Sequence, residues 1–158
     1  MVGDPAHHIG AGRQRAFSSP RATAPLMPIS HRIDRDLGVV YLYVTGHVQP
    51  VDQSRHLKSL LADPDFRAGL HYLVDWRDGD EANTSEEVRM MADAVRRESA
   101  RLGGSRFAIV VRSDVQYGLT RVFAAFVGDA PLEFQTFRKI DDACRWLGES
   151  VGRPVSPP

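Results

Sequence analysis

Strand-like apolar runs alternate with helical segments along most of this chain, and this order restricts its fold more than any other feature. A short strand near residues 31–34 and a turn at residues 35–38 precede the run VVYLYVTGHV, and the runs HYLVDW, FAIVV and LEFQTF follow. Apolar residues at helical spacing separate these runs and follow the last one. Because parallel strands require crossovers, the order β-β-α-β-α-β-α-β-α predicts an α/β domain with a mixed, mainly parallel sheet of about five strands and four helices.

The helical segments carry apolar residues at intervals of three and four. The first ends before the Asp-Pro pair at 63–64, because proline cannot continue a helix. The second begins with the capping-box residues Thr84 and Glu87, and we expect it to continue through Leu102 to the Gly pair at 103–104. The apolar faces consist of Leu57, Leu60 and Leu61; Val88, Met91, Val95 and Leu102; Leu119, Val122, Phe123, Phe126 and Val127; and Ile140, Ala143, Trp146 and Leu147.

The two ends of the chain lack this patterning. Residues 1–28 are rich in Gly, Ala, Ser, Pro and Arg, and the last residues read PVSPP. We therefore expect a flexible leader at 1–28, a domain at 29–150 and a flexible tail at 151–158. Since Met27 directly precedes the first patterned segment, the sequence leaves open whether residues 1–26 belong to the native protein.

Composition excludes several classes of partner. The formal net charge is +0, which is not typical of a nucleic-acid-binding protein or a polybasic membrane anchor. No run approaches the roughly 18 apolar residues of a membrane-spanning helix, and the leader lacks the apolar segment of a secretory signal. The single cysteine, Cys144, cannot form an internal disulfide. We expect a cytoplasmic protein with no integral membrane segment and no nucleic-acid partner.

Three stretches, taken with the order of elements, resemble one bacterial family. They are TGHV, LVDWRD, and AIVVRSDVQYGLTRVF followed by FRKIDDACRWL. Over about residues 30–149 the chain resembles the SpoIIAA-like family, within the superfamily of STAS (anti-sigma-factor-antagonist) domains, whose fold is shared more distantly by Sec14-type lipid-binding domains. The resemblance implies a βα fold of this type and a binding or regulatory role, with no enzymatic activity established for the family as a whole. It implies no particular ligand.

The antagonist branch of that superfamily is phosphorylated on a serine in an Asp-Ser-Ser-Gly segment at a helix start. The matching place here reads Asn83-Thr84-Ser85-Glu86, so the candidate phosphosites are Ser85 and Thr84. A phosphate on Ser85 gains from the helix N-terminus but meets like charge from Glu86 and its acidic neighbour. The alternative is that Thr84 simply caps the helix.

Ligands of open α/β sheets tend to bind where strands end and helices begin, which directs attention to the turns after Trp76 and residue 111. Asp75 ends a buried strand, so its carboxylate needs a partner such as an arginine or helix amides. Trp76 is either part of a pocket wall or a half-buried core residue. In the second turn we expect Asp114 to cap the next helix, with Ser113 and Tyr117 beside it.

Gly118, Arg121 and Ala125 are spaced to lie on one side of that third helix. A glycine there costs roughly 1 kcal/mol relative to alanine and calls for a reason. One interpretation is a face that another backbone or a flat ligand approaches while Arg121 binds a carboxylate or phosphate. The other is that Gly118 permits close helix-sheet packing and Arg121 is solvated.

Metal and cofactor patterns are not found. Residues 75–81 contain clustered acids, but Arg77 occupies a position where a calcium loop needs an oxygen ligand. The histidines lack metal-ligand spacing, and no nucleophile elbow, phosphate loop or dinucleotide fingerprint occurs. We expect no metal, no cofactor and no catalytic residue.

The leading hypothesis is a non-enzymatic regulatory module that contacts a protein partner, or a second copy of itself, through the third helix. The alternative is a protein that binds a lipid or a small apolar or anionic molecule, although about 120 patterned residues need most of their apolar side chains to fill their own core. An enzyme using Asp75 and Arg121 is a third hypothesis, which requires both side chains on one face.

Overall fold

The computed structural model describes residues 27–158 and contains one five-stranded sheet with the strand order β1-β2-β3-β4-β5. β1 pairs antiparallel with β2, and the remaining neighbours are parallel. The predicted α/β class with a mixed, mainly parallel sheet is therefore confirmed. The strands are β1 (Ile29–Asp34), β2 (Val39–Gly46), β3 (His71–Gly79), β4 (Arg106–Val110) and β5 (Glu133–Phe137).

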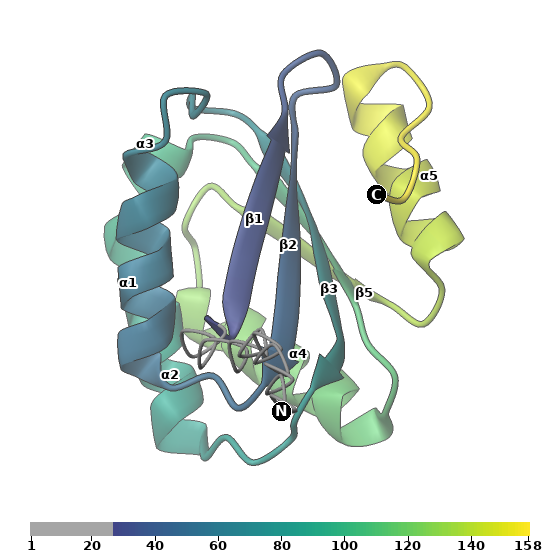
Figure 1. Cartoon of the computed structure of the whole chain (residues 1–158). Helices are drawn as coiled ribbons and strands as arrows, with labels where there is room; N and C mark the ends of the chain where they lie inside the picture. Colours follow the sequence, from purple (N-terminus) through teal and green to yellow (C-terminus); the bar gives the residue numbers. More distant parts are fainter. Residues whose placement is uncertain (1–26) are drawn as a thin grey trace, which may run out of the picture.

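The helices divide unequally between the two faces of the sheet (Figure 1). Within residues 27–158, α1, α2 and α4 pack over one face of the sheet, and α5 packs over the other. Because every crossover between neighbouring parallel strands has the same hand, successive crossover helices fall on the same side. The helices are α1 (Pro50–Leu61), α2 (Ser85–Arg97), α3 (Ser99–Leu102), α4 (Asp114–Val127) and α5 (Ile140–Val151).

The helix expected to run from Thr84 to Leu102 is interrupted, which adds one short helix to the predicted set. At Glu98 the backbone N–H donates to the Val95 carbonyl three residues earlier, at 3.1 Å. This tighter turn ends α2 and starts α3, so that Leu102 still reaches the core. Residue spacing alone did not reveal the break, since the apolar face continues across it.

Strand alternation produces two separate apolar cores. On β3, Tyr72 and Val74 face the helical layer of α1, α2 and α4, whereas Leu73 faces α5. The core under α1, α2 and α4 is the larger of the two and contains the ring of Phe107.

The segment after α5 lies against the α5 side of the sheet. Val155 is buried in the α5 core, and the Tyr41 hydroxyl donates to the Ser156 carbonyl at 3.1 Å. The flexibility expected for residues 151–158 stays a prediction, but these contacts give the segment a defined position. The predicted leader falls almost wholly outside the described residues.

Candidate functional site

An apolar cavity of about 180 Å³ lies between the sheet and the layer of α1, α2 and α4. It is partly open to solvent. Strand residues such as Tyr72 and Phe107 form one wall, and helix residues such as Val88, Met91 and Phe123 form the other. Close-packed domains rarely contain voids larger than a water molecule, so this space is unusual for a core of this size.

Aromatic rings line one part of the cavity in a continuous stack. The rings of Tyr72 and Phe107 are parallel with centroids 4.3 Å apart, and Phe107 stacks on Phe134 at 4.8 Å. Phe123 of α4 meets Phe134 edge-on at 5.6 Å. Rings held in this way present both flat faces and edges, which suits contact with another ring.

None of the described residues that line the cavity is Asp, Glu, Lys or Arg. The lining carries polar groups only on neutral side chains, chiefly Gln53, His56, Tyr72, Asn83 and Thr120. Burying an unpaired charge in such surroundings costs several kcal/mol, because the ion loses its hydration and gains no opposite charge. The cavity therefore favours uncharged molecules.

Two polar atoms of the lining have no hydrogen-bond partner. They are the Gln53 side-chain oxygen and the Tyr72 hydroxyl, both shielded from solvent. Tyr72 is only 1% exposed, and burial raises the pKa of its hydroxyl, which keeps the phenol neutral. A buried polar group without a partner costs about 1–3 kcal/mol, and because these two atoms have almost no accessible surface, the cavity as it stands does not reach them.

A chain of side chains leads from the cavity to the surface at β1. The Nε2 atom of His56 lies 3.0 Å from Nδ1 of His31, whose Nε2 lies 3.0 Å from the Asp63 carboxylate. The backbone N–H of Asp65, followed by His31, lowers the pKa of Asp63, so this carboxylate accepts from His31. Because each imidazole nitrogen either donates or accepts, the two short contacts couple the tautomer of His56 to that of His31. Burial, with the neighbouring His31, lowers the pKa of His56 to about 4, which keeps its imidazole neutral near pH 7.

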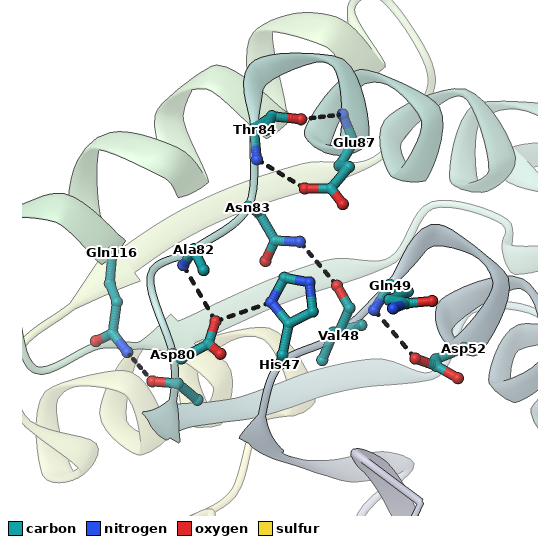
Figure 2. Close-up of polar contacts among 11 residues, drawn as sticks. His47, Val48, Gln49, Asp52, Asp80, Ala82, Asn83, Thr84, Glu87 and Gln116 are labelled. Carbon is teal, nitrogen blue, oxygen red and sulfur yellow. Dashed lines mark hydrogen bonds and ion pairs between the residues drawn. The ribbon is translucent and has the colours of Figure 1, made fainter.

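The two edge loops, residues 47–49 and 80–84, are tied together at one end of the cavity (Figure 2). The Asn83 amide donates to the Val48 carbonyl at 2.8 Å, and both residues line the cavity. His47 Nδ1 lies 3.1 Å from an Asp80 carboxylate oxygen. The Ala82 backbone N–H, followed by His47, lowers the pKa of Asp80, so the ionised carboxylate holds both loops.

Gln116 connects the last residues of β3 to the start of α4 (Figure 2). Its fully buried amide donates to the carbonyls of Trp76 and Gly79, each at 2.9 Å. Its oxygen accepts from the backbone N–H groups of Arg112 and Ser113. Sequence reasoning missed this residue, although the spacing Ser-x-x-Gln from Ser113 is the signature of a capping box.

The residues predicted around the first turn separate onto opposite faces of the sheet. Trp76 lines the cavity, as one of the two interpretations anticipated. Asp75 alternates with it and so points to the α5 side, where the Arg77 guanidinium donates to both carboxylate oxygens at 2.9 and 2.7 Å. The Arg77 side chain lowers the pKa of Asp75. The expected arginine partner is thus Arg77.

At the start of α4 the expected cap is wrong. Ser113 is the N-cap, and its hydroxyl accepts from the Gln116 backbone N–H at 3.1 Å. Asp114 is the first helical residue, and its exposed carboxylate pairs with Arg138, a residue that sequence reasoning did not select. The Arg138 guanidinium also lies 5.2 Å from the centre of the Tyr117 ring. Asp114 and Tyr117 therefore belong to a surface cluster, away from the cavity.

Gly118, Arg121 and Ala125 share the solvent-facing side of α4, as their spacing predicted. A Cβ atom at Gly118 would have nothing within 4 Å, so close helix-sheet packing does not explain this glycine. Arg121 takes part in no salt bridge within residues 27–158. Since α4 covers the face opposite to Asp75, Asp75 and Arg121 share no site.

Thr84 caps α2 in the expected capping box. Its hydroxyl accepts from the Glu87 backbone N–H at 3.2 Å, and the Glu87 carboxylate accepts from the Thr84 N–H at 2.8 Å. Ser85 is exposed at the first turn of the helix. The Thr84 hydroxyl thus has a structural role, and modification of Ser85 or Thr84 stays a prediction.

No group of three or more His, Cys, Asp or Glu side chains within residues 27–158 is placed to hold a metal ion. No helix described by the structure is long and apolar enough to cross a bilayer. In comparisons with known proteins, no family model and no curated protein matches this chain.

Proposed function

We propose that this domain is a non-enzymatic cytoplasmic binding protein that holds a small, mostly apolar molecule in the cavity between the sheet and α1, α2 and α4. The observation that supports this most directly is a space of about 180 Å³ with an apolar lining in the larger core. Dry apolar cavities of about 150 Å³ bind benzene or xenon in another protein. A cavity of this size accepts one ring or a short chain and is too small for a lipid with long acyl chains.

As the sequence indicates, a domain of this size needs most of its apolar side chains to fill its own core. This limits the size of a ligand but leaves room for a small one. The α5 side has its own buried core around Val155, and the other side keeps free space within its larger core. The titratable lining residues are His56 and Tyr72, and burial disfavours the charged form of each. Neutral, hydrogen-bonding side chains in an apolar wall support binding more than proton transfer.

Titration of the ¹⁵N-labelled protein with toluene, followed by NMR, tests this proposal. We expect saturable shifts at lining residues on β3, β4 and α2, and no shifts around the α5 core. Val88→Phe adds volume inside the cavity and should weaken toluene binding at least about tenfold. Val115→Phe adds the same volume on the exposed side of α4, where Val115 is 51% exposed, and serves as the control.

The stability of Val88→Phe is measured alongside by denaturant unfolding, and Val44→Phe, at another lining position, replaces it if the fold is lost. Absence of saturable shifts in the unaltered protein would contradict the proposal. So would equal toluene affinity in the filled and control variants, since binding would then lie elsewhere.

A second candidate function is self-association through the outer side of α4. Val115 and Val122 are 51% and 37% exposed there, and the open position of Gly118 lets another backbone approach. If this side joins two copies, Gly118→Trp should convert a dimer to a monomer in sedimentation experiments while the unfolding transition is retained. A monomer at high concentration before the substitution would remove this candidate.

A further inference from the structure

The largest side chain of the cavity lining belongs to Trp76, near the carboxyl end of β3. We propose that Trp76 limits the size of the ligand, so that the cavity accepts molecules with one ring and excludes flat molecules with two fused rings. This step rests on the proposed binding function of the cavity. It assigns a role in specificity to Trp76 and the role of positioning its ring to Gly79.

Trp76 contributes to the cavity wall without being packed into either core. It lines the cavity, yet it belongs to neither of the two apolar clusters that the described residues form. Tyr72 and Phe107, which line the same cavity, are buried members of the larger core. Shortening Trp76 therefore enlarges the cavity without removing a member of a core, whereas shortening either of the other two rings also removes core packing.

Gly79 provides the room that the Trp76 ring occupies. A Cβ atom at residue 79 would lie 2.0 Å from Cδ1 and 2.1 Å from Nε1 of the Trp76 ring, which is closer than side chains pack. Any residue other than glycine would thus force the ring out of its place. Gly79 is not among the described residues that line the cavity, so at this point the tryptophan borders the free space.

Gln116 holds the backbone on both sides of this contact. Its buried amide donates to the Trp76 and Gly79 carbonyls, each at 2.9 Å. The pairing of the two strands shifts register here, between residues 43–45 of β2 and residues 75–78 of β3. Such an irregularity interrupts the ladder and redirects side chains, and a single amide ties together the two carbonyls beside it. The backbone that carries the Trp76 ring is therefore fixed by hydrogen bonds.

The free volume then decides which molecules fit beside this ring. A space of about 180 Å³ is of the size that holds one ring, and a second fused ring would overlap with the wall. The indole group of Trp76 itself consists of two fused rings, so its removal adds room for a second ring. The stacked rings of Phe107 and Phe134 stay in place to contact it.

The test compares naphthalene with toluene by NMR titration of the ¹⁵N-labelled full chain. The quantity measured is the ratio of the two dissociation constants, because comparing this ratio between a variant and the original protein removes the different hydration of the two probes. Naphthalene should bind the original protein at least about tenfold more weakly than toluene. Trp76→Ala should shift the ratio toward naphthalene by about tenfold or more. Trp146→Ala removes another half-buried tryptophan on the α5 side and should leave the ratio unchanged.

The positioning of the ring is tested at residue 79. Gly79→Ala must displace the Trp76 ring and should change the toluene affinity at least about threefold, whereas Gly118→Ala, where a Cβ atom meets nothing within 4 Å, should not change it. When Gly79→Ala is combined with Trp76→Ala, its effect on toluene binding should disappear, because the ring that it displaces is gone. An effect that persists in the double variant would show that Gly79 does not act through Trp76.

The outcomes separate this inference from the proposed function. If toluene binds but the ratio is the same in Trp76→Ala and the original protein, the size limit at Trp76 is wrong and the apolar cavity function survives. The same conclusion follows if naphthalene binds the original protein as tightly as toluene. If toluene does not bind the original protein, both proposals fail. Trp76→Leu, which keeps a smaller apolar side chain, replaces Trp76→Ala if denaturant unfolding shows that the fold is lost.

Discussion

Among single residues, His56 is the side chain whose protonation the fold most clearly opposes. It is 8% exposed, and burial, with His31 beside it, lowers its pKa to about 4 from the ordinary value of 6.5. Its Nε2 lies 3.0 Å from His31 Nδ1, and His31 Nε2 lies 3.0 Å from the Asp63 carboxylate. This arrangement ties the middle of α1 to β1 through a neutral imidazole.

The free energy of unfolding should therefore fall as the pH drops from about 6.5 to about 4. Within this window the unfolded chain binds a proton on residue 56 and the folded protein does not, so acid favours unfolding. Lowering the pKa of His56 from 6.5 to about 4 corresponds to a loss of about 3 kcal/mol in the free energy of unfolding across this window. Denaturant unfolding at a series of pH values measures this change.

The comparison for this prediction uses two variants. His56→Gln keeps a donor for His31 but does not titrate, so its stability should change less between pH 6.5 and 4. Leu60→Ala, at a buried position on the same helix, should lower stability at all pH values without changing the slope. Burial also lowers the pKa of His71, which contributes in the same direction in all three proteins. An unchanged slope in His56→Gln would show that residue 56 does not govern this window.

The positions of Gln53 and His56 beside the cavity were not predictable from the sequence, for a physical reason. On an amphipathic helix a polar residue next to the apolar stripe is ordinarily solvated, and nothing in the spacing of α1 indicates a cavity beside it. Trp76 was selected because it stands at the end of a strand, a position that topology alone identifies. The polar residues of the cavity lining are recognisable only when the facing helices and strands are placed together.

At the scale of elements, α4 shows both what the sequence predicts and what it leaves out. Its apolar spacing predicted the helix, and Ser113 and Gln116 form its cap. The cap was assigned to Asp114 because aspartate and serine are equally common caps, and sequence spacing does not distinguish two neighbouring candidates. As the sequence indicates, glycine at position 118 destabilises the helix relative to alanine. The open surroundings of Gly118 show that close packing within the domain does not explain its presence.

Gly118→Ala should raise the free energy of unfolding by about 0.5–1 kcal/mol, because alanine is the better helix former and the added methyl meets nothing within 4 Å. Gly148 of α5 provides the comparison. A Cβ atom there would lie 3.0 Å from the Arg153 carbonyl oxygen, so the segment after α5 must move and the gain should be smaller or reversed. Urea unfolding of the two variants measures the difference. Equal gains at both glycines would contradict this explanation.

At the scale of the whole molecule, the order of elements was predictable because each parallel strand requires a crossover helix. That order also places α1, α2 and α4 over the same face, while α5 covers the other. The free volume was not predictable, because it depends on how closely three helices approach one sheet and on the size of side chains such as Val88 and Met91. The same composition packed slightly closer would have left no cavity.

The antiparallel direction of β1 determines where attachments to this protein should be made. Ile29 lies opposite Val44, and the Thr45 N–H donates to the Pro28 carbonyl at 2.9 Å, so the chain enters β1 at the edge where Val48 lines the cavity. The carboxyl end follows Ser156 on the α5 side of the sheet. A fluorophore, affinity tag or sensor surface joined at the carboxyl end thus lies on the opposite side of the sheet from the cavity, whereas a fusion partner placed just before Ile29 would stand beside Ile29 and Val48, which line it.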